Sequence, residues 1–238
     1  MKSKLGYIKF VVLLALVAFL YGFAEQRHSQ RKLDGTEVHF TDNENLYVTI
    51  DAVNNLLIQS EESNENLRKE TLDLNRVESL LNSHDMIENA EVFLKLNGKL
   101  SAIVTQRKPI GRAVGSTSFY LDKNGEVMPL SENFSARVPL MLGFNESNIL
   151  NAYPLVSYIK NDSFLNKHIT IIQRLANGRY ELKLRKVGFV VYFGEIKNIA
   201  LKFNNFKAFY KKALKDKKLD TYKKVNLQFG NQVVCTKK

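Results

Sequence analysis

The chain has 238 residues, enough for one large domain or two small ones, and its 45% hydrophobic content is typical of a packed globular protein rather than a disordered one. The formal net charge of +11 belongs to the second half. Residues 25–110 carry 10 basic and 15 acidic side chains, whereas residues 111–238 carry 22 basic and 9 acidic ones. Such a half could face DNA, anionic lipid or an acidic protein. The single cysteine, Cys235, excludes an intrachain disulfide.

Near the N-terminus, residues 10–24 form an uncharged, mostly apolar run. A helix over this run is about 22 Å long, and extension back to Leu5 reaches the length that a membrane requires if Lys9 extends to the lipid headgroups. We therefore predict a cytoplasmic tail over residues 1–6 and a transmembrane helix over residues 7–24. A signal peptide cleaved after Ala24 is the alternative. Either way the rest of the chain is exported, which excludes DNA as the main partner.

A first exported domain is predicted over residues 34–112. In chain order we expect a strand over 36–40, a helix capped by Thr49, a polar connection over 59–70, a helix capped by Asp73, and strands over 90–96 and 99–105. Asn97–Gly98 between the last two strands is typical of a tight hairpin turn. This β-α-α-β-β order allows two helices to cover one face of a small sheet.

A second exported domain is predicted over residues 117–238. We expect two short strands around a turn at 123–125, a strand over 138–142, a helix over 148–160, strands over 168–175, 180–184 and 188–193, and an amphipathic helix over 197–218. Residues 225–235 alternate as a final strand. A last strand with no successor is expected at a sheet edge, where it can pair with a strand of another chain.

Several segments, in this order, resemble the bacterial cell division family FtsQ/DivIB. They are "IENAEV" at 87–92, "QRKPIGR" at 106–112, "FYLDKNGEVMPL" at 119–130 and "RVPLMLGF" at 137–144. Many members of that family have Glu where this chain has Gln106. The resemblance implies that residues 34–112 form a POTRA domain. The expected fold is therefore α+β: an N-terminal transmembrane helix, the POTRA domain, and a mixed, mostly antiparallel β domain with a late helix and a C-terminal edge strand.

The resemblance also implies a partner. In the family, the C-terminal strand and the helix before it are implied to take up FtsB, which travels with FtsL. The predicted partner-binding residues are Val225, Leu227, Gln228, Phe229, Gln232, Val233 and Val234 on the strand, with Tyr210 and Lys211 on the helix. Gln228 stands where a basic residue is common in the family, and neighbouring Lys223 or Lys224 could substitute for it.

No motif in the sequence indicates catalysis. The four histidines share no metal-ligand spacing, and Asp122 and Glu126 flank a turn, where Asp supports the turn itself. We expect no catalytic residue, cofactor, metal or nucleic acid.

The resemblance implies a single-pass scaffold of the divisome in the bacterial inner membrane. Its N-terminus would lie in the cytoplasm and its bulk in the periplasm. At the septum it would recruit FtsB- and FtsL-type partners, with other divisome components possible through the POTRA domain, and so link early and late division proteins. The alternative is a membrane-anchored, POTRA-bearing assembly or secretion factor, and an enzyme of the cell wall is a third interpretation.

Overall fold

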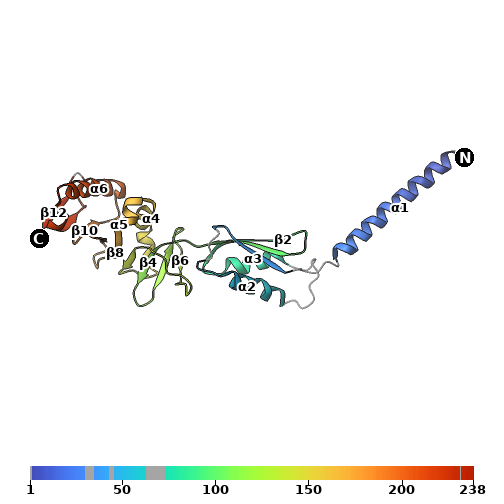
Figure 1. The fold of residues 1–238 in the computed structure, drawn as a ribbon, viewed down its shortest axis with the longest axis horizontal. Helices are drawn as coiled ribbons and strands as arrows, with labels where there is room; N and C mark the ends of the chain where they lie inside the picture. Colours follow the sequence, from blue (N-terminus) through green and yellow to red (C-terminus); the bar gives the residue numbers. More distant parts are fainter. Residues whose placement is uncertain (1, 30–34, 43–45, 63–72, 231) are drawn as a thin grey trace. The chain divides into compact units, whose positions relative to one another are not determined.

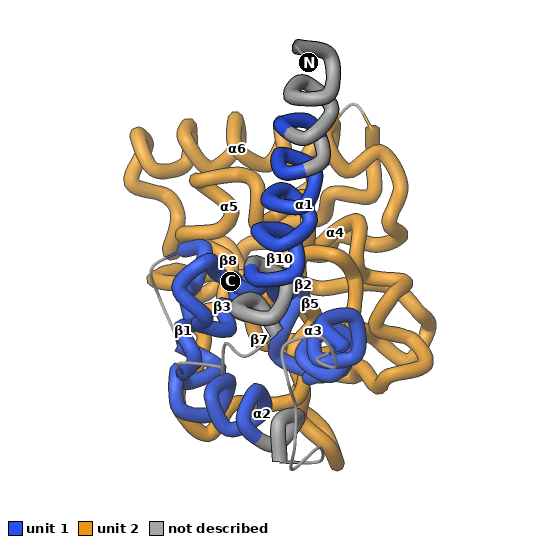
Figure 2. The backbone as a smooth tube through the Cα atoms, turned by 90° about the vertical axis from the view of Figure 1, so that its right-hand side faces the viewer, with its two compact units in different colours: residues 1–106 blue, residues 107–238 orange. Residues whose placement is uncertain are grey.

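The computed structural model describes residues 2–29, 35–42, 46–62, 73–230 and 232–238 (Figure 1). Two compact units make up the chain, residues 1–106 and 107–238 (Figure 2). The division falls before residue 112, the predicted end of the first domain, because β4 (Pro109–Val114) belongs to the sheet of the second unit.

The first helix, α1 (Lys2–Ser29), extends past both ends of the predicted 7–24 segment. The side chains described for residues 9–10 and 12–23 are exposed. Among the helices of the described residues, none is both long enough and apolar enough to cross a membrane. The transmembrane helix therefore remains a prediction.

The rest of the first unit has the predicted order of one strand, two helices and two strands. These elements are β1 (Thr36–Phe40), α2 (Ile50–Glu62), α3 (Leu74–Asn82), β2 (Ile87–Leu94) and β3 (Leu100–Gln106). The sheet order is β1-β3-β2, with β1 parallel and β2 antiparallel to β3. Helix α2 contacts β1, α3 contacts β2, and the two helices contact each other, so they cover one face of the sheet.

Local sequence determines where these helices start. The Thr49 hydroxyl accepts a hydrogen bond from the Ala52 N–H at 3.1 Å, and the Asp73 carboxylate accepts one from the Arg76 N–H at 3.2 Å. Both predicted caps are confirmed, since each satisfies a first-turn N–H that has no partner within the helix. Helix α2 continues to Glu62, so the start of the connection predicted over 59–70 is helical. The remainder of that connection lies outside the described residues.

Gln106 ties the end of β3 to the segment that leads into α2. Its side-chain oxygen accepts hydrogen bonds from the backbone N–H groups of Tyr47 and Val48, at 2.8 and 2.9 Å, and only 8% of the residue is exposed. An amide oxygen accepts such bonds as a carboxylate does. Gln106 can therefore accept the same two hydrogen bonds as the Glu that the sequence resemblance implies at this position.

The second unit is built on one mixed sheet with the strand order β12-β11-β10-β9-β8-β7-β4-β5-β6. After β4, its strands are β5 (Phe119–Asp122), β6 (Val127–Met128), β7 (Leu140–Leu142), β8 (Ile169–Arg174), β9 (Tyr180–Leu184), β10 (Val190–Gly194), β11 (Tyr222–Asn226) and β12 (Val234–Lys237). The β4–β7, β7–β8 and β10–β11 pairs are parallel, and the remaining neighbours are antiparallel.

Helices pack on this sheet to form one hydrophobic core. They are η2 (Ile149–Ala152), α4 (Tyr153–Asn161), α5 (Ser163–His168) and α6 (Ile199–Lys215), and a short 3-10 turn, η3 (Leu219–Thr221), precedes β11. The apolar face predicted for the helix over 197–218 consists of Ile199, Phe203, Phe206, Tyr210 and Leu214. Phe203, Phe206 and Tyr210 join the core, whereas Leu214 is 57% exposed. The mixed α+β architecture is confirmed. Helix α5 was not predicted, because its six residues are too few to show a helical period.

The continuous final strand predicted over 225–235 is wrong. The chain instead forms β11, leaves the sheet at Leu227, and returns as β12, which pairs antiparallel with β11. The Asn226 carboxamide accepts a hydrogen bond from the Gln228 N–H at 2.9 Å, a local turn that ends β11. The Gly230–Asn231 dipeptide could have indicated this break.

Candidate partner-binding surface

Strand β12 forms one outer edge of the nine-stranded sheet. Within the described part of the chain its one strand neighbour is β11, so one side of its backbone faces no strand. Unpaired N–H and C=O groups on such an edge can bond to an added strand. The C-terminal strand is therefore at a sheet edge, as predicted, although it begins at Val234 rather than Val225.

The segment between β11 and β12 is fastened to the rest of the unit at two places. The Asn205 side chain on α6 donates a hydrogen bond to the Gly230 carbonyl at 2.9 Å. Gly194, at the end of β10, has φ of +74°, and a Cβ there would lie 2.8 Å from Cγ of Gln228. The Gln228 side chain therefore packs where only glycine leaves room.

The structure separates the predicted strand residues into buried and exposed groups. Val225 and Leu227 are buried in the core, at 0% and 1% exposure. Gln228, Phe229, Gln232 and Val234 are exposed, and Val233 is half-buried. The exposed residues are accessible at the surface, whereas the two buried ones hold β11 and its exit from the sheet.

The two predicted helix residues lie in different surroundings. Tyr210 packs edge-on against Phe164 of α5, with ring centroids 5.2 Å apart, and belongs to the core. Its neighbour Lys211 is exposed. Tyr210 thus contacts α5, whereas Asn205, also on α6, contacts the segment between β11 and β12.

Leu201 belongs to this surface but was not predicted. It is 44% exposed on α6, and a Cβ added at Gly230 would lie 3.9 Å from its Cδ2. Phe229 and Val234 are 46% and 40% exposed. We call Leu201, Phe229, Val234 and the free edge of β12 the edge surface. Leu201 was missed because the contact of α6 with Gly230 is not evident from the helical period.

Lys223 and Lys224 of β11 differ in whether their charges are free to bind a partner. The Lys224 ammonium lies 3.3 Å from the Glu181 carboxylate and 4.2 Å from the centre of the Tyr192 ring. Lys223 is exposed. Of the two lysines proposed to substitute for the basic residue absent at Gln228, Lys224 is therefore already engaged within the chain.

Lys202 of α6 is buried, and backbone carbonyl groups at the end of β10 bind its ammonium. Its ammonium donates to the carbonyl of Phe193, within β10, at 2.9 Å and to that of Glu195, just after β10, at 2.7 Å. Desolvation by burial lowers the pKa of Lys202, although the Glu195 carboxylate opposes that shift. The contacts tie α6 to β10 and so help to position the edge surface.

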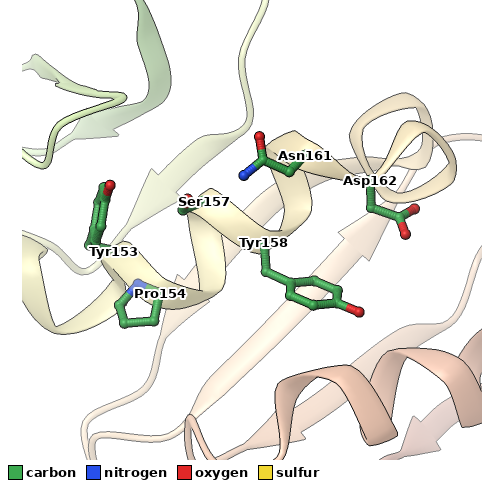
Figure 3. Close-up of a pocket in the computed structure, with 6 residues that line it drawn as sticks. All are labelled: Tyr153, Pro154, Ser157, Tyr158, Asn161 and Asp162. Carbon is green, nitrogen blue, oxygen red and sulfur yellow. The ribbon is translucent and has the colours of Figure 1, made fainter.

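A shallow pocket of about 490 Å³ lies along α4 (Figure 3). Tyr158 and Asp162 point toward α6, where Tyr158 stacks on Phe203 with ring centroids 5.5 Å apart and Asp162 forms an ion pair with Lys207. The pocket is therefore bordered by contacts that hold α4 and α5 against α6. In the described ranges, no group of three or more His, Cys, Asp or Glu side chains could hold a metal ion.

The second unit matches a known protein family. A family model described as FtsQ/DivIB, C-terminal related, matches residues 108–236, from just before β4 to within β12. Because the match covers more than half of the chain, the protein belongs to this family. Membership indicates a role associated with bacterial cell division and interactions with other proteins of the division machinery. No curated protein matches the chain in sequence.

Proposed function

We propose that this chain is a membrane-anchored scaffold of the divisome, without enzymatic activity, whose second unit binds an FtsB-like protein accompanied by an FtsL-like protein. In this role it links early and late division proteins at the septum. The observation that carries the proposal is the free edge of β12, which lies at the end of the family-matched region. Family membership favours this role over an assembly or secretion factor.

Binding by strand addition suits the edge surface. A partner strand would extend the sheet beyond β12 through backbone hydrogen bonds, which supply affinity with little dependence on side chains. Exposed Phe229 would serve as an aromatic anchor that a partner pocket could bury, and Leu201 would add apolar contact beside it. The net charge of +13 over residues 111–238 would speed the encounter with an acidic partner.

The first unit is proposed to be of POTRA type and to offer a second surface to other divisome components. Its β-α-α-β-β order and the position of Gln106 support this assignment. The apolar run within α1 is proposed to anchor the chain in the inner membrane, with a cytoplasmic N-terminus and a periplasmic bulk. Mass measurement of the mature protein tests the anchor, because loss of residues 1–24 would reject it.

Co-purification from native membranes tests partner binding. A tagged chain truncated after Gln232 lacks β12 but retains Val225 and Leu227 in the core, so we expect it to fold and to lose the FtsB-like partner. Leu150→Ala is the matched control. Leu150 is 57% exposed, and its Cδ2 lies 3.7 Å from the Cβ position of Gly125, near β6 at the opposite end of the sheet. Equal recovery by the wild type and a folded truncated chain would contradict strand addition.

A further inference from the structure

We propose that a basic cleft in the second unit, separate from the edge surface, binds an acidic segment of a partner protein. The cleft has a volume of about 670 Å³, within the range of known ligand sites. Its lining includes Arg137, Lys167, His168, Arg185, Lys186 and Tyr210. We call it the basic cleft.

The fold brings these cations together from distant parts of the sequence. Arg137 precedes β7, Lys167 is in the last turn of α5, and Arg185 and Lys186 follow β9. The Arg185 N–H donates a hydrogen bond to the His168 carbonyl at 2.7 Å, which joins the end of β9 to the start of β8. The basic cleft therefore lies where β7, β8 and β9 meet, several strands away from β12.

Within the described residues, the four cations of the basic cleft are not ion-paired. Arg137, Lys167, Arg185 and Lys186 are all exposed, and none forms an ion pair with any residue that the structure describes. Lys207 and Lys224 of the same unit, in contrast, each pair with a carboxylate. Clustered like charges in a concave site raise the local potential and attract anions. The charges of the basic cleft are thus available to a ligand.

An aromatic cluster supports one wall of the cleft. The His168 ring stacks on Phe164 with centroids 4.2 Å apart, its Nδ1 lies 2.7 Å from the Phe164 carbonyl oxygen, and Tyr210 packs edge-on against both rings. This wall is held in place before any ligand arrives. A rigid aromatic wall also offers apolar contact to the stems of bound side chains.

The arrangement favours carboxylates spaced along a peptide over a single compact phosphate. Compact phosphate sites are commonly formed by backbone N–H groups at a helix N-terminus. Here the helix end at the cleft is the C-terminus of α5, and the positive charges come from side chains of separate segments. The Asn166 carboxamide adds a group that can both donate to and accept from a peptide backbone. Several separated cations fit several separated carboxylates.

Binding of a fluorescein-labelled decapeptide of alternating Glu and Gly to the full chain in neutral detergent tests this inference. At low ionic strength, fluorescence anisotropy should show binding that the double variant Arg137→Gln/Arg185→Gln weakens about tenfold, since each exposed charge pair contributes modestly. The matched control Lys160→Gln/Lys183→Gln removes the same charge from exposed positions outside the cleft and should change the affinity less than about twofold. If the first variant fails to fold, Lys167→Gln/Lys186→Gln replaces it.

Three results would overturn the inference. One is equal affinity of the wild type and a folded cleft variant, and another is an equal loss in the control variant, which would indicate general charge attraction. The third is tighter binding of inorganic pyrophosphate than of the peptide, abolished by the same cleft variants, because the ligand would then be a phosphate compound. Phe229→Ala should leave peptide binding unchanged, so failure here and failure of the edge surface are distinguishable.

Discussion

The two outer edges of the nine-stranded sheet are built differently. At one edge, β6 has two residues, and the turn before it is fixed by Asp122, whose side chain is completely buried. At the other edge, β12 has four residues and follows a segment that exposes Phe229. A two-residue edge offers few backbone groups to a partner, whereas a longer strand offers a pairing template. The β6 edge is therefore too short to pair with a partner strand, whereas the β12 edge is long enough to do so.

Substitution of Asp122 should have the largest effect and should be confined to stability. The carboxylate accepts hydrogen bonds from the N–H groups of Asn124 and Glu126, at 2.9 and 2.8 Å, and pairs with Arg107 at 2.9 Å. Asp122→Ala leaves the Arg107 guanidinium without this partner and should lower the free energy of unfolding by about 3 kcal/mol. Urea denaturation measures the change. Asp122→Asn keeps an acceptor for the turn and should cost less, and neither variant should weaken partner binding if the β6 edge is closed.

Phe229→Ala should weaken partner binding but leave the stability of the fold almost unchanged. If Phe229 anchors the partner, its loss should weaken binding by about 2 kcal/mol or more. Because 46% of the residue is exposed in the free chain, the free energy of unfolding should change by less than about 0.5 kcal/mol. Titration of the purified partner measures the first quantity and urea denaturation the second. A large loss of stability together with unchanged binding would show that Phe229 is a structural residue.

Asn205→Ala should loosen the fastening of the segment before β12. The lost hydrogen bond to Gly230 contributes about 1 kcal/mol, so local opening of β12 should become about fivefold more frequent. Cys235, the only cysteine of the chain, lies in β12, and desolvation by burial raises the pKa of its thiol, which slows its reaction in the closed state. The rate of thiol labelling therefore reports opening. An unchanged rate would mean that the Asn205 contact does not hold the strand.

Elements specified by a few neighbouring residues could be predicted from the sequence. The Asp73 cap forms, Gly98 and Gly125 adopt φ of +93° and +88° in their turns, and Asp122 supports its turn as expected. Each depends on a side chain and a backbone group only a few residues apart. The conformation of such caps and turns can therefore be predicted without knowledge of the tertiary fold.

Features that depend on distant contacts were not predicted. The parallel pairing of β1 with β3 joins segments separated by both helices of the first unit. The basic cleft gathers Arg137, Lys167 and Arg185, none of which is near another in the sequence. The exit of the chain from the sheet after Asn226 also involves Gly194, which leaves room for the Gln228 side chain. Hydrophobic periodicity carries no information about these contacts.

The smallest effect is expected from the ion pair between Asp162 and Lys207, which holds α5 against α6. Helix α6 also binds the segment that precedes β12. Burial alone would raise the pKa of Asp162, but hydrogen bonds from Lys207 and from the backbone of Leu165 and Phe164 outweigh it, and the pKa lies below its usual value. Because the folded-state pKa is depressed, the stabilisation is fully present above the unfolded-state value of about 3.9 and is lost as the pH falls through the folded-state pKa. We expect urea denaturation of wild type and Asp162→Asn to show a stability difference at pH 7 that shrinks on acidification over this range. A difference independent of pH down to the acid end of the range would mean that the Asp162 charge does not stabilise the fold.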